Sequence, residues 1–376
     1  MKKDDLLMMK KNRDTNLELF RIITMLLIIA HHYVVNSGLT SYGSPLLENL
    51  MSKRALCVII FGAWGKMGIN CFLLITGYFM CKSSITVKKY MKLILEVLFY
   101  RIAIAGIFWI TGYTEFSFSE LLQTMIPVTD ISDGFTSTYL IFFLCIPFLN
   151  ILIHNMSQKQ HIYCVLLVSF IYVFFGTFKM IFHVTMNYVS WYMVVYLIAA
   201  YVRIYPHEIF EKVKLWGGIA IGLIVFCCIF TIYDVLNNSR LYYHVTDSNT
   251  FLALATAFSM FMFFKNVRIP YVSWINKLAA SCFGVLQIHA QSDAMRKWLW
   301  QDVCNNVGMF YSKWLPVHAI GSVFVIFIVC SAIDMLRVSL IERPFFSLWD
   351  KYWNDIKNLY VHVERRIMEY FDVTQE

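Results

Sequence analysis

Long apolar segments alternate with short polar ones along most of the chain. We expect ten of these segments to cross a membrane as helices, since a membrane-spanning helix needs about 20 predominantly apolar residues. A membrane strand would show about ten residues of alternating polarity instead. The ten candidate spans are 17–36, 56–80, 91–112, 137–153, 161–178, 188–204, 215–234, 250–264, 276–291 and 315–340.

The pattern predicts an all-α, polytopic integral membrane protein with about ten transmembrane helices. Loops after the even-numbered spans carry more lysine and arginine, as in "CKSSITVKKYMK", than loops after the odd-numbered spans. The positive-inside rule then places both termini in the cytoplasm. Four basic residues run against that rule: Lys53, Arg54, Arg296 and Lys297.

The domain organisation follows from what the chain lacks. It has no linker rich in Pro, Gly or Ser and no repeat at a fixed period, so we expect one transmembrane domain over 1–345. Residues 346–376 mix aromatic and charged residues at helical spacing. This tail is expected to form a cytoplasmic amphipathic helix at the membrane surface.

Composition supports the membrane assignment, with 59% hydrophobic residues, 15% charged residues and a mean hydropathy of +0.60. That leaves too little polar surface for a soluble globule. The net charge of +8 is spread over loops, which indicates topology rather than a nucleic-acid partner. Ten cysteines lie mostly in apolar runs without metal-ligand spacing, so no metal site is expected.

The first span carries ionisable groups at both ends. Arg21 and His32 are eleven residues apart, which on a helix is about 20° past three full turns, so both side chains share one face. They are separated by about 16 Å along the axis. Glu18 lies on nearly the same face and can pair with Arg21.

Two interpretations of this helix remain open. In the structural one, Arg21 extends to the inner headgroups while His31 and His32 cap the outer end. In the functional one, ionisable groups within a span face a cavity and act there. A neutral histidine can accept and return a proton, as acyl transfer to an alcohol requires.

The stretch "NLELFRIITMLLIIAHHY" resembles the first helix of the membrane acyltransferase-3 family, with Glu18, Arg21 and His32 at the signature positions. "INCFLLITGYFM" is similar to the family's second-helix motif, with Thr76 in place of its serine. "SCFGVLQIHA" resembles a late helix that ends in histidine, here His289. "LIERPF" resembles the closing motif that contains Glu342. The family's arginines after the second helix are replaced by Lys88, Lys89 and Lys92, whose ammonium groups are candidates to hold phosphates as point charges.

The resemblance implies a bacterial-type inner-membrane O-acyltransferase with no tightly bound cofactor. Acyl-CoA, expected to be acetyl-CoA, would donate its acyl group from the cytoplasm to a hydroxyl of a cell-surface glycan or lipid-linked saccharide. His32 would be the general base, with a transient acyl carrier as the alternative. Arg21 would hold the CoA portion, and Glu18 would position Arg21.

Several other residues are candidate binding groups that also have structural explanations. Asn70 faces either a substrate passage or another helix through a hydrogen bond. Trp191 is either an interfacial anchor or a platform for a sugar. His289 is either a second cavity histidine or a structural one, and Glu342 is either a binding residue or a partner of Arg337 or Arg343. Gly62, Gly65, Gly68 and Gly77 predict close helix packing.

Two other function classes remain. Arginine and histidine facing a cavity also suit a non-enzymatic transporter or lipid-glycan flippase. A catalytically silent scaffold with the same fold is the third possibility. The chain has no G-x-S-x-G elbow and no P-loop, so any catalysis is expected within the membrane bundle.

Overall fold

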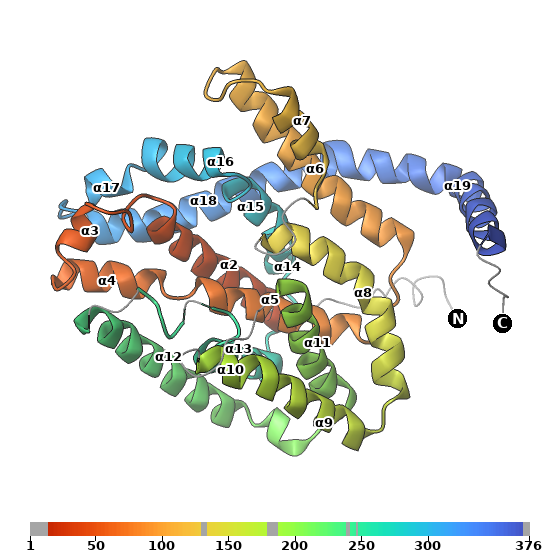
Figure 1. Cartoon of the computed structure of the whole chain (residues 1–376), viewed down its shortest axis with the longest axis horizontal. Helices are drawn as coiled ribbons and strands as arrows, with labels where there is room; N and C mark the ends of the chain where they lie inside the picture. The colour runs from red at the N-terminus through yellow and green to blue at the C-terminus, as the bar shows by residue number, and fades with distance from the viewer. Residues whose placement is uncertain (1–13, 129–133, 179–186, 238–240, 246, 371–376) are drawn as a thin grey trace. The chain divides into compact units, whose positions relative to one another are not determined.

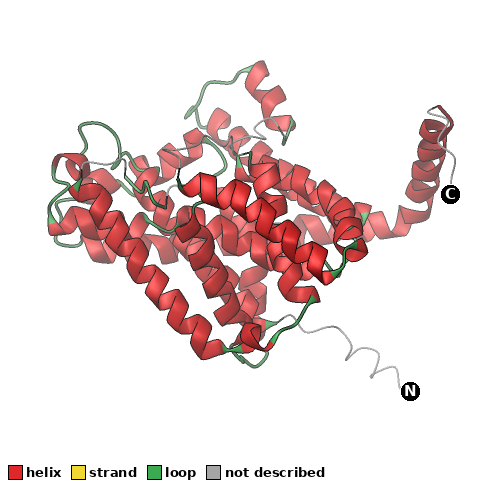
Figure 2. Cartoon of the chain, turned by 60° about the horizontal axis from the view of Figure 1, so that its bottom comes forward, coloured by secondary structure: helices red, strands yellow, loops and turns green. Residues whose placement is uncertain are grey.

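The computed structural model describes residues 14–128, 134–178, 187–237, 241–245 and 247–370, apart from a few side chains near the C-terminus. These residues are almost entirely helical, and no strand occurs among them (Figure 2). The chain divides into two compact units, Met1–Cys330 and Ser331–Glu376. The predicted division after residue 345 stays a prediction.

Seven apolar helical segments within the described residues are long enough to cross a membrane. The expectation of an all-α, polytopic membrane protein is therefore confirmed. The seven segments are Thr15–Val35, Lys53–Met80, Val87–Ile110, Phe135–Asn155, Gln158–Thr177, Val213–Leu236 and Leu315–Trp353.

The remaining three expected spans correspond to helices of fewer than 18 residues, too short to count among these seven segments. The sixth and eighth are the apolar helices α11 (Tyr188–Ile204) and α13 (Phe251–Asn266). The ninth is a pair of eight-residue helices, α14 (Ser273–Ala280) and α15 (Cys282–His289), which meet at Ser281. The sidedness of the termini stays a prediction.

The first unit is built around α5 (Gly65–Met80), which packs against α2 (Thr15–Val35), α11 and α13 (Figure 1). The unit also contains α14, α15, the first part of the helix that begins at Leu315 and, within its described residues, ten further α-helices. They are α3 (Pro45–Glu48), α4 (Lys53–Gly62), α6 (Val87–Ile110), α7 (Phe118–Met125), α8 (Phe135–Asn155), α9 (Gln158–Ser169), α10 (Phe175–Thr177), α12 (Val213–Leu236), α16 (Asp293–Lys297) and α17 (Asn306–Met309).

Helix starts follow from local sequence. Ser52 caps α4 by accepting the backbone N–H of Ala55, and Thr86 caps α6 through the N–H of Lys89. Ser157 and Gln160 form a reciprocal capping box at the start of α9. These side chains satisfy backbone donors that a helix leaves unpaired at its first turn.

Glycines let α4 and α5 approach α2 closely, as the sequence predicted. A Cβ on Gly62 would come within 2.7 Å of Val34, and one on Gly68 within 2.6 Å of Ile28. A Cβ on Gly65 would overlap the His31 ring. The three glycines therefore hold the backbone of one helix segment against side chains of the other.

The second unit contains the end of α18 (Leu315–Arg337), a π-helical turn (Val338–Glu342) and α19 (Arg343–Tyr370). Arg337 lies in a buried ion-pair group, 2.9 Å from Asp334 Oδ1 and 2.8 Å from Glu342 Oε2. The pairing of Glu342 with Arg337 is one of the two structural alternatives considered for this glutamate. Mutual compensation of this kind lets charges remain buried.

Candidate functional site

A cavity of about 710 Å³ lies within the first unit and contains both histidines of α2. Its walls come from α2, the start of α5, α6, α7, the start of α8, α11 and the segment from α15 to α16. His31, His32 and Lys66 line it together. A cavity that gathers titratable groups from several helices is the expected form of a small-molecule site.

His32 is held by His289, the last residue of α15. The Nδ1 atom of His32 lies 3.0 Å from Nε2 of His289, whose own Nδ1 lies 2.6 Å from the carbonyl oxygen of Val285. A carbonyl oxygen only accepts, so the His289 Nδ1 carries a hydrogen and donates it. In the neutral ring its Nε2 is then an acceptor, and His32 Nδ1–H donates to it.

This chain of two hydrogen bonds fixes the neutral tautomer of His32. With the hydrogen on Nδ1, the lone pair is on Nε2, which has no hydrogen-bond partner among the described residues. A lone pair on an oriented ring is what a general base needs. His289, which is fully buried, therefore acts on His32 rather than lining the cavity itself.

His31 reaches the same cavity by a different route. Its Nδ1 lies 2.6 Å from the carbonyl oxygen of Gly62, so this ring also carries its hydrogen on Nδ1. Helix geometry placed His31 about 100° away from the face shared by Arg21 and His32. The cavity is wide enough to include both neighbours, so the structure offers two histidines where the sequence favoured one.

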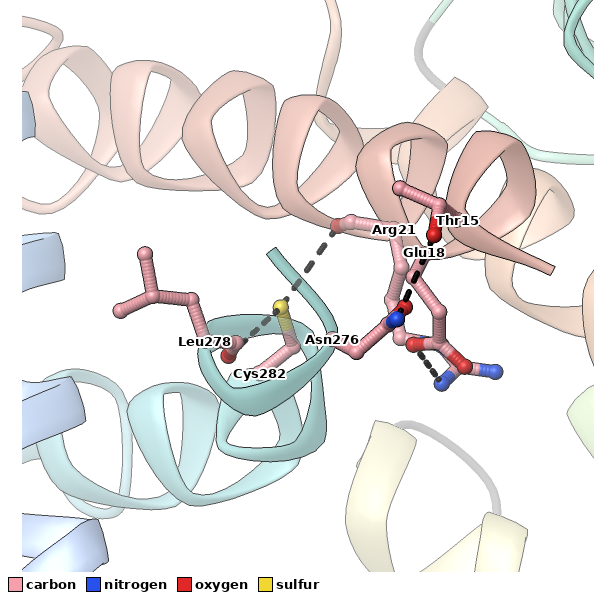
Figure 3. A network of polar contacts seen from close by, with 6 residues as sticks. All are labelled: Thr15, Glu18, Arg21, Asn276, Leu278 and Cys282. Carbon is pink, nitrogen blue, oxygen red and sulfur yellow. Dashed lines mark hydrogen bonds and ion pairs between the residues drawn. The ribbon is translucent and has the colours of Figure 1, made fainter. Parts of the chain in front are cut away.

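The α14–α15 pair runs beside α2 in the same direction. Asn276 Nδ2 donates to Thr15 Oγ1 at 3.3 Å, and the Cys282 thiol approaches the Arg21 carbonyl oxygen at 3.7 Å (Figure 3). Further along both elements come His32 and His289. This side-by-side arrangement brings the late histidine to the early one.

Arg21 and Glu18 form the predicted ion pair, with Nη1 and Oε2 2.8 Å apart (Figure 3). The Glu18 side chain is 6% exposed and that of Arg21 is 24% exposed. Neither residue is part of the cavity lining. Thr76 Oγ1 lies 3.3 Å from the Tyr139 hydroxyl and is also outside the cavity lining, so a binding role for Thr76 stays a prediction.

Asn70 and Trp191 form a buried connection between helices. Asn70 Nδ2 donates to the Ser248 carbonyl at 2.7 Å, and its Oδ1 accepts from Trp191 Nε1 at 3.0 Å. Both residues are fully buried and outside the cavity lining. These contacts match the interhelical hydrogen bond considered for Asn70, and a binding role for either residue stays a prediction.

The remaining candidates are not among the residues that line the cavity. Lys88, Lys89 and Lys92 lie in the first turns of α6, where Lys89 Nζ donates to Ser83 Oγ at 2.9 Å and to the Ser84 carbonyl at 2.7 Å. Glu342 belongs to the second unit. Binding roles for these four residues stay predictions.

Two cavity residues were missed by the sequence analysis. Lys66 lies within the apolar segment Lys53–Met80, and Arg101 lies within Val87–Ile110. Both line the cavity. The sequence contained a signal for both residues, because each is an ionisable residue inside a candidate span. The same criterion singled out Arg21.

Of the residues that the structure describes, no three or more His, Cys, Asp or Glu side chains are grouped so as to hold a metal ion. The described lining of the cavity supplies histidines, cations and hydroxyl groups. This set suits proton transfer and electrostatic stabilisation.

Comparison with known proteins gives one match. The family model Acyl_transf_3, described as an acyltransferase domain, matches residues 14–335. No curated protein and no solved structure matches the chain. The matched range includes α2, α15 and every residue of the cavity lining. The chain therefore belongs to the Acyl_transf_3 family and is a multi-pass membrane acyltransferase.

Proposed function

We propose that this protein transfers an acyl group, acetyl in the simplest case, from cytoplasmic acyl-CoA to a hydroxyl of a cell-surface glycan or lipid-linked saccharide. It would act in the inner membrane of a bacterium. The observation that carries the proposal is the oriented His32, whose Nδ1–H donates to His289 and whose Nε2 lone pair is free in a cavity of about 710 Å³.

The reaction that this arrangement supports is direct acyl transfer. The acceptor hydroxyl gives its proton to His32 Nε2 while its oxygen attacks the thioester carbonyl carbon. The carbon–sulfur bond then breaks, the new ester forms, and the proton on His32 passes to the CoA thiolate. No oxidant, reductant or further co-reactant is required.

Arg21 and Glu18 supply the proposed donor end of the site. Arg21 is eleven residues from His32 on α2, about 16 Å along the axis, which is comparable to an extended pantetheine arm. Its ion pair with Glu18 fixes the direction of a guanidinium that can hold a phosphate or carbonyl of CoA. The thioester would then reach His32 from the Arg21 side.

The test is transfer by purified protein from radiolabelled acetyl-CoA to candidate glycans. His32→Ala is expected to lower kcat by a factor of about 10² or more, as removal of a general base does. The matched control is His207→Ala, because His207 is exposed in a loop and lies outside the cavity lining. Full transfer by His32→Ala overturns the assignment of the base.

A second measurement addresses the class of protein. The same protein is reconstituted in vesicles, and movement of the saccharide is followed together with ester formation. Movement without an acylated product identifies a transporter and contradicts the proposal. An acylated product that depends on acetyl-CoA supports it.

A further inference from the structure

Lys66 and Arg101 place two positive charges in the histidine cavity, although both lie in apolar helices. Lys66 is the second residue of α5, and Arg101 is in the interior of α6. On α6, Arg101 shares its face with Val97, Ala105 and Phe108, which also line the cavity. A charge within a membrane helix is costly to bury, so such residues generally face a cavity or a partner.

The partners of both cations are neutral. Lys66 Nζ donates to the Tyr188 hydroxyl at 2.7 Å and lies 5.3 Å from the centroid of its ring. Arg101 donates from Nε to the Thr124 carbonyl at 3.1 Å and from Nη2 to the Gln123 carbonyl at 2.7 Å. Neither cation has a carboxylate within ion-pair distance in the described part of the chain.

The described part of the lining does not pair with these charges. Apart from Lys66 and Arg101, the charged side chains of its described residues are Arg296, Asp293 and Glu120. Arg296 pairs with Asp293, and the Arg296 Nη1 also donates to the Ala290 carbonyl at 3.3 Å. Glu120 is exposed on α7. Two cations with spare N–H groups therefore face the space next to the oriented histidine.

The position of the cavity separates these cations from the proposed donor site. The lining includes residues from the segments 114–124 and 134–137 and residues 290–294 and 296, whose loop portions are expected on the outer side of the membrane, whereas Arg21 lies near the opposite end of α2. The phosphates of a cytoplasmic CoA would meet Arg21 first. The charges of Lys66 and Arg101 can therefore interact with the other substrate, the acyl acceptor.

We infer that Lys66 and Arg101 form a subsite for a negatively charged group on the acyl acceptor. The acceptor class is thus an anionic saccharide, whose charge is either a carboxylate on the sugar or a phosphate that links it to a lipid. Charge-assisted hydrogen bonds from an ammonium and a guanidinium are the interactions that recognise both groups. This inference rests on the proposed function for the acceptor's place in the cavity.

Binding to the purified full-length protein, measured by calorimetry without turnover, tests the subsite. One pair of probes is trigalacturonate and a neutral trigalactoside, and the second pair is farnesyl phosphate and farnesol. We expect the anionic member of at least one pair to bind about tenfold or more tightly than its neutral counterpart, as hydrogen bonds to charged groups typically allow. The pair that shows the preference identifies carboxylate or phosphate as the recognised group.

The variants assign the preference to the two cations. Lys66→Gln is expected to remove most of the preference, Arg101→Gln to reduce it, and Lys66→Arg to retain it because the charge remains. The matched control is Lys53→Gln, which removes an exposed cation outside the lining. The thermal midpoint of each variant, measured without ligand, shows whether the variant is folded. If Lys66→Gln does not fold, Lys66→Arg still keeps the test valid.

Three results overturn the inference. In the first, the wild type binds neither anionic probe better than its neutral counterpart. In the second, the preference for the anionic probe survives both charge-removing substitutions in folded protein. In the third, Lys66→Gln weakens the binding of CoA itself. Failure of the proposed function looks different, because the binding preference then persists in a protein that forms no ester. If the protein transfers acyl groups to a neutral glycan and shows no preference for anionic probes, the inference is wrong while the proposed function stands.

Discussion

His289 Nε2 accepts a hydrogen bond from His32 Nδ1 at 3.0 Å, although the two residues are 257 positions apart in the chain. The Val285 carbonyl, 2.6 Å from His289 Nδ1, determines the direction of that bond. A backbone carbonyl in α15 thus determines which nitrogen of a histidine in α2 carries the lone pair. His289 is a positioning residue, and four predictions about the site and its packing follow from such contacts.

Replacing His289 by alanine removes the acceptor that orients His32. We expect kcat to fall about tenfold to a hundredfold with little change in KM, less than the loss on removing the base itself. His289→Gln should restore part of the activity, because its side-chain carbonyl can accept the same N–H. Steady-state kinetics of both variants test this prediction. An equal loss of kcat in His289→Ala and His289→Gln would indicate a purely structural role for His289.

The two cavity histidines are distinguished by comparing His31→Ala with His32→Ala. His31 donates to the Gly62 carbonyl and packs on Gly65, so its loss should reduce the thermal midpoint and leave measurable transfer. Loss of His32 should reduce kcat by a factor of about 10² or more with a smaller effect on the midpoint. Single-turnover assays and thermal unfolding of both variants test this. If His31→Ala abolishes transfer while His32→Ala mainly lowers the midpoint, His31 is the base.

Gly77 is expected to tolerate no larger residue. A Cβ there would come within 2.8 Å of Ala199 Cβ and 3.1 Å of the Tyr196 backbone, so Gly77→Ala should cost about 1 to 3 kcal/mol of stability by overpacking. Gly106→Ala is the control, because nothing lies within 4 Å of that position and the substitution should be neutral or slightly stabilising. Unfolding in detergent measures both, and equal effects would contradict the close approach of α5 and α11.

Asn70→Ala should lower stability by about 1 to 3 kcal/mol, because it leaves the buried Trp191 indole N–H and the Ser248 carbonyl without their partner. Asn237→Ala serves as the control, because it removes an exposed amide that donates to the Tyr233 carbonyl of the preceding helix. With Asn70 outside the cavity lining, KM should stay near its wild-type value in protein that folds. A large rise in KM without loss of stability would instead support the binding role that the sequence suggested.

The part of the site that lies on one helix could be predicted from the sequence. The Glu18–Arg21 pair is a contact between residues three apart, and it forms as expected at 2.8 Å. The glycine contacts of α4 and α5 with α2 were also predicted, because small residues at helical spacing are typical of close packing. Lys66 and Arg101 were detectable by the same rule as Arg21 and were overlooked.

The sequence by itself determined most of the long apolar helices and the ionisable residues of α2, because helix periodicity and side-chain polarity act over a few residues. Only the tertiary structure decided that His289 orients His32 and that Lys66 and Arg101 share their cavity. It also decided that Asn70 and Trp191 meet in the interior. These relationships depend on which helices lie side by side, and that is set by packing between segments far apart in the chain, such as those of Thr15 and Asn276, which are 261 residues apart.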